Sequence, residues 1–111
     1  MAQSDIPSIR GRWGSVAVAG DSMAPTYISG DWLIVRWSGP YRVGQVVVVE
    51  REECPGVFLV KRIVRQAGEK YWVEGDNQSS STDSRQWGEL SGPEILGKVL
   101  FRFRKAKKKS H

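Results

Sequence analysis

The spacing of glycine and proline constrains this fold more than any other feature of the sequence. The 111 residues contain 12 glycines and 5 prolines, spread along the whole chain. They interrupt it at intervals too short for long helices. The segments between them are rich in Val, Ile, Trp, Tyr and Phe, which favour strands. We therefore predict a mainly β fold, a compact core of coiled antiparallel sheets, with strands at 16–19, 32–37, 46–50, 57–64, 71–74 and 98–103. We expect few helical turns, around 24–27 and 93–96.

The length of the chain fits one domain that can bury a real core without covalent cross-links. Residues 13–103 hold the predicted strands. Residues 1–12 are polar, and residues 104–111 are mostly basic. We expect a flexible polar N-terminus at 1–12, a catalytic domain at 13–103 and a disordered basic tail at 104–111.

The histidine and cysteine content excludes several kinds of site. The one histidine is the last residue, His111, and a frayed terminus cannot hold the imidazole of a Ser-His-Asp triad. The one cysteine, Cys54, can form neither an intrachain disulfide nor a Cys/His zinc site. We expect no metal and no cofactor, so any chemistry must use Ser, Thr, Lys, Asp, Glu or Tyr.

The net charge of +5 comes from the C-terminal end of the chain. Six of the 17 basic residues lie in the last ten, which leaves 11 against 12 acidic residues. We therefore expect no nucleic-acid partner, and at most a weak peripheral contact of the tail with anionic lipid. The longest unbroken aliphatic run is 46–49, far short of a transmembrane segment, and the N-terminal residues lack the apolar stretch of a signal peptide. These patterns predict a cytoplasmic protein.

The predicted strand at 57–64 places two cations on opposite faces. Alternation puts Lys61 between Leu59 and Ile63, whereas Arg62 points to the other side, where it can pair with a carboxylate. An ammonium group among apolar side chains loses hydration, and burial lowers the pKa of lysine. This strand can therefore provide a neutral amine near neutral pH.

Two polar segments could meet that amine. Ser22 follows Gly20-Asp21 at a turn, where a serine hydroxyl and its own backbone N–H can point toward one place. The loop 75–85 gathers polar residues directly after a strand, and in it Asp83 and Arg85 can form an ion pair while Ser81 offers a hydroxyl. Alone, a serine in a turn or a polar loop is usually structural. Three such stretches in an apolar β chain indicate one shared site.

The order of these segments resembles the motif set of type I signal peptidases, which are serine peptidases with a Ser/Lys dyad. The resemblance covers 20–97 and rests on Ser22-Met23-Ala24-Pro25-Thr26, Gly30-Asp31, Lys61-Arg62 and the stretch from Gly75-Asp76-Asn77 through Ser81, Asp83 and Arg85 to Gly88. It implies that Ser22 is the nucleophile and Lys61 the general base. It also implies that Ser81 orients the lysine amine and that Asp83 and Arg85 form a structural ion pair.

The chain also departs from that family. Only 21 mostly polar residues precede Ser22, where signal peptidases carry a membrane anchor. Gly20 stands where some relatives have a serine as an oxyanion donor, so only backbone donors are expected there. The region between Lys61 and Gly75 is short. These features are most similar to the small soluble branch that matures nickel-type superoxide dismutase. The resemblance thus implies an endopeptidase that removes a leader or propeptide from a protein precursor.

Two other functions fit parts of the sequence. Self-cleaving repressors use the same Ser and Lys, but 21 residues before Ser22 are too few for a helix-turn-helix unit. A small β-barrel that binds nucleic acid would use the five tryptophans and the basic tail. The neutral body of the chain argues against that second alternative.

Overall fold

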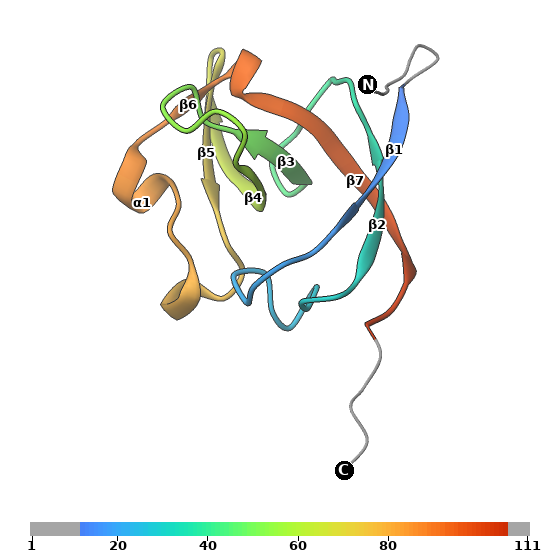
Figure 1. Cartoon of the computed structure of the whole chain (residues 1–111). Coiled ribbons are helices and arrows are strands. Elements are labelled where there is room, and N and C mark those ends of the chain that lie inside the picture. Colours follow the sequence, from blue (N-terminus) through green and yellow to red (C-terminus); the bar gives the residue numbers. More distant parts are fainter. Residues whose placement is uncertain (1–11, 107–111) are drawn as a thin grey trace.

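The structure, a computed structural model, describes residues 12–106 and is built on one antiparallel sheet. The sheet has seven strands in the order β1-β2-β7-β3-β4-β5-β6, and it is open and strongly coiled (Figure 1). The strands are β1 Trp13–Ala17, β2 Trp32–Arg36, β3 Val46–Glu50, β4 Phe58–Ala67, β5 Lys70–Glu74, β6 Leu90–Ser91 and β7 Ile95–Arg104. The mainly β prediction is confirmed.

The short elements differ in part from the sequence prediction. The two-residue strand β6 was not predicted, nor were the 3-10 turn η1 (Gln78–Ser80) and the single-turn helix α1 (Ser84–Trp87). The turn expected at 24–27 forms, with the Tyr27 N–H donating to the Met23 carbonyl over 3.0 Å. The turn expected at 93–96 lies earlier, as η2 (Gly92–Glu94), and residue 95 already begins β7.

The two predicted terminal segments lie mainly outside the described residues, which exclude 1–11 and 107–111. Residues 104–106 of the predicted tail are described. Arg104 ends β7, and the backbone N–H of Ala106 donates to Asp31 Oδ1 over 2.7 Å.

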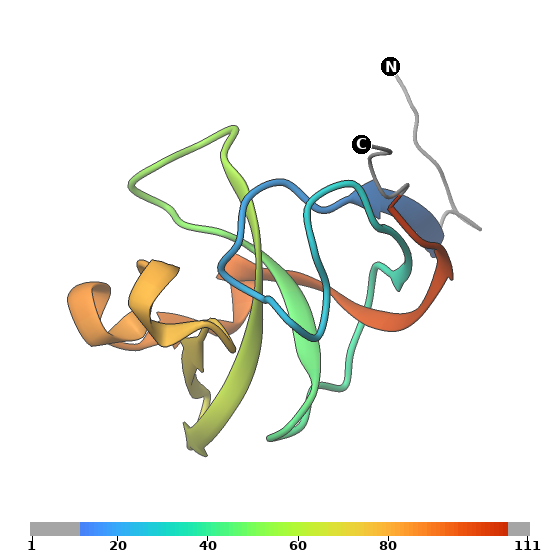
Figure 2. The ribbon, with the colours of Figure 1, turned by 90° about the horizontal axis from the view of Figure 1, so that it is seen from below.

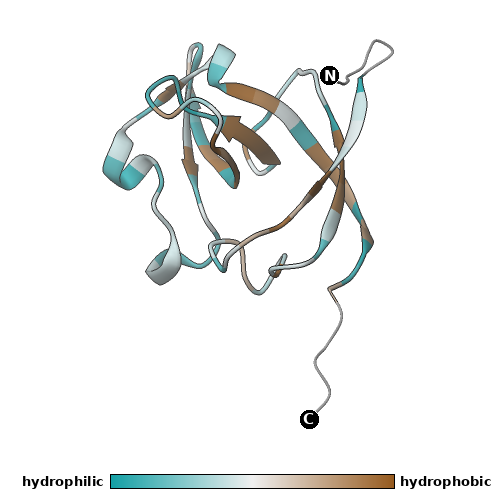
Figure 3. Ribbon diagram, viewed as in Figure 1, coloured by the Kyte–Doolittle hydropathy of each residue, from teal (hydrophilic) through white to brown (hydrophobic). Residues whose placement is uncertain are grey.

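The core lies against β3 and β4. The four valines of β3 are all buried, and their high hydropathy colours this strand brown in Figure 3. They occupy the middle of the sheet, where a strand is covered on both faces and reads as an unbroken apolar run. The core cluster consists of Val47, Val49, Ile63, Val73, Leu90 and Ile95. It gives β4 a rigid support directly next to Lys61.

A long loop, residues 18–31, joins β1 to β2 and carries Ser22. Its two ends are held together, because the Val18 N–H donates to the Asp31 carbonyl and the Gly30 N–H to the Val18 carbonyl, each over 2.8 Å. The buried Asp31 carboxylate also accepts from the Ile28 N–H and from Arg102 of β7. Figure 2 shows this loop in blue and teal. The fold thus fixes the base of the loop while leaving its tip free to meet other segments.

Candidate active site

Lys61 is a buried amine on a rigid strand. It lies in the middle of β4, and its residue is only 2% exposed. Ile63 is fully buried on the same face, and Leu59 is half-buried, as the alternation predicts. Burial lowers the pKa of the Lys61 ammonium below its ordinary value; the Asp83 carboxylate opposes this shift, and the Arg85 guanidinium adds to it. The setting favours the neutral amine.

The Ser81 hydroxyl connects Lys61 to Asp83. Ser81 Oγ lies 3.0 Å from Lys61 Nζ, 3.1 Å from the Gly75 N–H and 2.6 Å from Asp83 Oδ2. A carboxylate only accepts hydrogen bonds, so the hydroxyl must donate its one proton to Asp83. Ser81 Oγ therefore accepts from both Lys61 and Gly75. The lone pair of a neutral Lys61 amine is then left free for another group.

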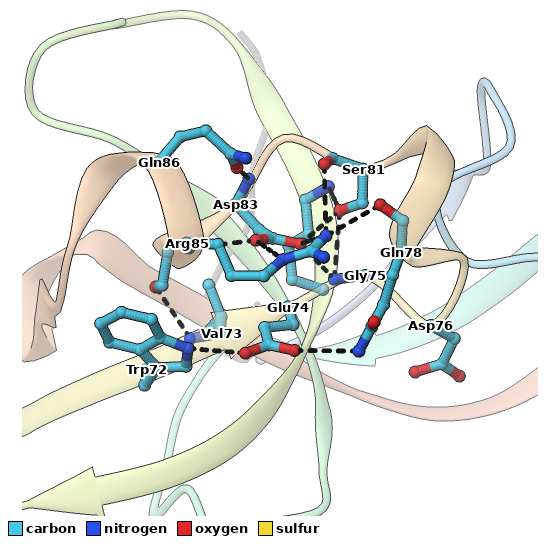
Figure 4. Close-up of polar contacts among 12 residues, drawn as sticks. Trp72, Val73, Glu74, Gly75, Asp76, Gln78, Ser81, Asp83, Arg85 and Gln86 are labelled. Carbon is cyan, nitrogen blue, oxygen red and sulfur yellow. Dashed lines mark hydrogen bonds and ion pairs between the residues drawn. The ribbon is translucent and has the colours of Figure 1, made fainter.

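Asp83 is held as a carboxylate by several donors, drawn in Figure 4. Its side chain is fully buried, and burial alone would raise its pKa. Hydrogen bonds from Arg85, Ser81 and Gly75 outweigh that cost and hold the pKa of Asp83 well below its usual range. Asp83 also caps α1, accepting from the Arg85 N–H over 3.1 Å, while Gln86 accepts from the Asp83 N–H. The predicted Asp83–Arg85 ion pair is present at 2.9 Å.

Ser22 faces the same cavity as Lys61. Gly20, Ser22, Leu59, Lys61 and Trp87 are among the residues that line a cavity of about 340 Å³. Ser22 and Leu59 also line a smaller cavity of about 80 Å³, between residues 17–23 and 58–60. Together the two cavities form one cleft with Ser22 at their junction. The predicted nucleophile and base therefore share a cleft.

Backbone donors are available near Ser22. Within residues 12–106 the N–H groups of Ser22 and Gly20 reach no acceptor. Gly20 has φ of +85°, a conformation that favours glycine, and a side chain there would enter open space. Among the described residues, the N–H of Ser22 and that of Gly20, two positions earlier, are therefore both available as donors.

A second polar cluster holds the Ser22 loop on the opposite side of β4. Arg62 donates Nε and Nη2 to the two oxygens of Asp76, over 2.9 and 2.8 Å. The same carboxylate accepts from the Thr26 hydroxyl over 2.6 Å, which ties Thr26 to the end of β5. The Arg62 hydrogen bond is the main reason that the pKa of Asp76 is lowered. We call Arg62, Asp76 and Thr26 the loop clamp.

The backbone after β5 adds further contacts to the Ser22 loop. The Asn77 N–H donates to the Ser22 carbonyl over 2.8 Å, and the Asn77 side-chain amide donates to the Asp21 carbonyl over 3.0 Å. Gly75 lies where these segments converge. A methyl group at Gly75 would overlap the Ser81 hydroxyl and the Ser22 carbonyl oxygen. Only glycine lets the loop and Ser81 approach this closely.

The structure thus brings together every predicted site residue, and it adds residues that sequence reasoning had left without a role. Those are Thr26, Gly75, Asp76 and Asn77. All four stand in the segments that carry the resemblance, so the motif pointed to them without saying what they contact. Arg62 was expected to pair with a carboxylate, and the structure identifies that carboxylate as Asp76.

Within residues 12–106, no group of three or more His, Cys, Asp or Glu side chains could hold a metal ion. No helix in the same range is long and apolar enough to cross a membrane.

A family model described as Peptidase S24-like matches residues 3–100, most of the chain. Three relatives are informative. The chain is 32% identical over 103 residues to the mitochondrial inner membrane protease subunit 2 of Schizosaccharomyces pombe. It is 28% identical over 111 residues to subunit 1 of this protease from Xenopus tropicalis. It is 30% identical over 112 residues to the mitochondrial ATP-independent inner membrane protease subunit 1a of Arabidopsis thaliana.

These alignments cover 71%, 78% and 77% of this chain. They cover 56%, 66% and 67% of the respective relatives. The chain therefore spans somewhat more than half the length of the relatives it matches.

Proposed function

Because the chain belongs to the Peptidase S24-like family, we propose that it is a serine endopeptidase in which Ser22 attacks and Lys61 acts as general base. One observation carries this proposal: a buried lysine amine, held by Ser81, shares a cleft with a serine whose backbone N–H reaches no acceptor within residues 12–106. The relatives, which are named as proteases, support the same class of activity.

Proton transfer starts from the neutral Lys61 amine. Its hydrogen bond to Ser81 uses an N–H, so the lone pair can take the proton of the Ser22 hydroxyl as the oxygen attacks a peptide carbonyl. The protonated Lys61 then gives this proton to the leaving amine, and water hydrolyses the acyl-enzyme. Burial of Lys61 brings its pKa toward the working pH, which raises the fraction of base that is ready.

The tetrahedral intermediate needs donors for its oxyanion. The backbone N–H of Ser22 is the first donor, and the backbone N–H of Gly20 is the second. Such fixed donors stabilise developing charge without reorganisation. A serine side chain is absent at Gly20, so we assign this task to the backbone alone.

We place the substrate in an extended conformation along β4. Residues 58–61 pair with β3 on one side, while the pairing with β5 begins only at Arg62. Their other edge is open beside residues 17–22, where a peptide strand can add backbone hydrogen bonds. This path leads the scissile bond past Ser22.

For the substrate, we propose a protein precursor with an N-terminal leader or propeptide, and specifically a nickel-type superoxide dismutase precursor. The motif set, Gly20 ahead of Ser22 and the short stretch between Lys61 and Gly75 support this choice. The nickel would belong to the substrate.

The test is incubation with that precursor, followed by mass analysis of the new N-terminus. We expect one defined cleavage by the wild-type protein and none by Ser22→Ala. Ser81→Ala should cut about 10²-fold more slowly, because it loses the contact that aligns the base. Thermal unfolding serves as the control for folding. Equal turnover by Ser22→Ala would refute the dyad, whereas an intact precursor together with cleavage of other leader-bearing proteins would refute only the substrate.

A further inference from the structure

Trp87 is a large aromatic side chain on the wall of the cleft that holds Ser22 and Lys61. It is half-buried and lines the cavity of about 340 Å³. Among the described residues that line this cavity, Trp87 is the only aromatic one, and Leu59 is the only other large apolar one. The proposed mechanism gives this ring no task.

Arg51 supports the Trp87 ring from outside the cleft. It follows β3, and its guanidinium carbon lies over the ring, 4.6 Å from the ring centroid. The Arg51 side chain is 18% exposed and is itself held by an ion pair with Glu53 over 2.7 Å. Arg51 does not line the cavity of about 340 Å³, so the Trp87 ring stands between the guanidinium and the cleft.

The other contacts of Trp87 also fix its position. Trp87 ends α1, where its backbone N–H donates to the Asp83 carbonyl over 3.0 Å. Its side chain packs against the hydrophobic core cluster. The ring is therefore in place before a substrate arrives, and a preformed wall of this kind loses little conformational entropy on binding.

The position of Lys61 decides which part of a substrate meets Trp87. Lys61 lines the larger cavity but not the smaller one of about 80 Å³. In the proposed mechanism Lys61 protonates the leaving amine, which is the backbone nitrogen of the first residue after the cleaved bond. That residue must therefore enter the larger cavity, next to Trp87.

The charge of Lys61 selects against charged side chains at this position. Lys61 becomes a cation when it takes the proton of Ser22, and a second cation beside it would oppose that step. A carboxylate would raise the pKa of Lys61 and keep it protonated before the reaction. An uncharged side chain avoids both effects. A planar ring gains most, because it can stack on Trp87 in addition to burying apolar surface.

We propose that Trp87 determines specificity by selecting an uncharged planar side chain on the first residue after the cleaved bond, and that Arg51 is a positioning residue for the Trp87 ring. This inference rests on the proposed peptidase function, because it requires Lys61 to protonate the leaving amine. The cavity of about 340 Å³ has room for such a side chain, since one water molecule takes only ~30 Å³ in the liquid.

The experiment is digestion of a peptide library prepared from a denatured cell proteome, followed by mass analysis of the new N-termini. We expect cuts that Ser22→Ala does not make, with Phe, Tyr and Trp enriched directly after the cut bond. Two synthetic peptides that differ only in Phe or Ala at this position then provide a ratio of kcat/KM. This ratio should be about ten in favour of Phe.

The variants test whether Trp87 causes this preference. Trp87→Leu should reduce the Phe-to-Ala ratio to less than about threefold, while the midpoint of the pH–rate profile stays in place, which separates lost selectivity from damage to the base. Arg51→Gln removes the support behind the ring and should give an intermediate ratio. Trp72→Leu is the matched control, because Arg65 lies over the Trp72 ring at 4.1 Å but Trp72 lines neither cavity of the cleft. It should keep the wild-type ratio.

Thermal unfolding checks the fold of each variant, and Arg51→Gln keeps the test open if Trp87→Leu does not fold. Absence of any Ser22-dependent cut would overturn the proposed function and this inference together. Ser22-dependent cuts without a preference for rings, or a preference that both variants retain, would overturn only the specificity assigned to Trp87. A preference for Lys or Arg would also overturn it, and would assign the selection to the Asp21 carboxylate in the same cavity.

Discussion

The two faces of β4 place two neighbouring cations, Lys61 and Arg62, in opposite environments. On one face, Lys61 is 2% exposed, and its hydrogen-bond partner is the neutral hydroxyl of Ser81. On the other, Arg62 is partly exposed and forms two hydrogen bonds to the Asp76 carboxylate. Both cations contact the loop that follows β5. Only Arg62 is given a direct counter-ion.

This difference separates two tasks that the proposed active site needs. In the proposed mechanism the general base must lose its proton easily, and Lys61 has no direct contact with a carboxylate because Ser81 lies between it and Asp83. A clamp must hold segments in place, so Arg62 is fully paired with Asp76, which in turn holds Thr26. We therefore expect changes on the Lys61 face to alter the pH dependence of catalysis, and changes on the Arg62 face to alter the rate alone.

The largest effect should come from Lys61. Lys61→Met removes the base and should lower kcat/KM by at least ~10³-fold. Lys61→Arg should be equally inactive, because a guanidinium stays protonated near neutral pH. The wild-type rate should rise with pH, with a midpoint well below ~10.4. A flat pH–rate profile, or an active Lys61→Arg variant, would make Lys61 a merely structural cation.

The pH dependence of the free energy of unfolding reports on the pKa of Lys61 without any substrate. The pKa of Lys61 is lowered in the folded state, so the unfolded chain binds more protons between that value and ~10.4. The free energy of unfolding of the wild type relative to Lys61→Met should therefore rise with pH in this window. Chemical denaturation at several pH values measures it. A relative stability that falls or stays constant would contradict the lowered pKa.

The next effect in size should come from Asp83→Asn. The amide no longer forces Ser81 to donate to it, so the lysine amine loses its fixed orientation, and kcat should fall by about 10²-fold. Loss of the buried carboxylate should also lower the free energy of unfolding, because its oxygens accept from Arg85, Ser81 and Gly75. Since Asp83 raises the pKa of Lys61, the midpoint of the pH–rate profile should move down. A midpoint that moves up would reverse the assigned influence of Asp83 on the base.

The lowered pKa of Asp83 also predicts how the stability of the protein changes in acid. Its folded-state pKa lies below the usual value near ~3.9, so its contribution to stability is fully present above that pH. The contribution is lost as the pH falls further. In acid denaturation, the wild type and Asp83→Asn should therefore differ less at low pH than at pH 7.

The Lys61 face of this site could be predicted from the sequence, whereas the Arg62 face could be predicted only in part. Alternation along β4 places Lys61 among Leu59 and Ile63, and the short spacing from Asp83 to Arg85 suggests their ion pair. The carboxylate that holds Arg62 could not be identified in this way. Thr26 and Asp76 are 50 positions apart, and they meet only because β4 and β5 bring the end of β5 under the Ser22 loop.

Short elements of secondary structure also could not be predicted from the sequence. α1 is only four residues long, so no helical period can reveal it, and it forms because Asp83 and Gln86 cap its first turn. β6 is two residues long and exists only through its pairing with β5. The crowding at Gly75 is likewise invisible in the sequence, since it arises from atoms of Ser22 and Ser81.

The clamp itself is tested by Arg62→Gln. Asp76 then loses its bidentate partner, and the loop that carries Ser22 is held less firmly, so kcat should fall about tenfold. The midpoint of the pH–rate profile should not move, because Arg62 is on the face away from Lys61. Arg62→Lys keeps the charge but cannot form two parallel hydrogen bonds to Asp76. Its kcat should therefore lie between those of Arg62→Gln and the wild type. A shifted midpoint would show that the two faces are not separate.

The smallest effect should come from Thr26→Val, which removes one hydroxyl and keeps the shape of the side chain. The lost hydrogen bond to Asp76 Oδ2 is 2.6 Å long, but Thr26 is exposed and one such bond contributes only about 1 kcal/mol. Asn77 still holds the Ser22 and Asp21 carbonyls, so the loop keeps two of its attachments. We therefore expect kcat to fall less than about fivefold, with an unchanged pH midpoint. Thr26→Ser retains the hydroxyl and should restore the wild-type rate. If Thr26→Val were as slow as Arg62→Gln, the clamp would act on Ser22 through Thr26 alone. If Thr26→Ser were as slow as Thr26→Val, the hydroxyl would not be what ties the loop to Asp76.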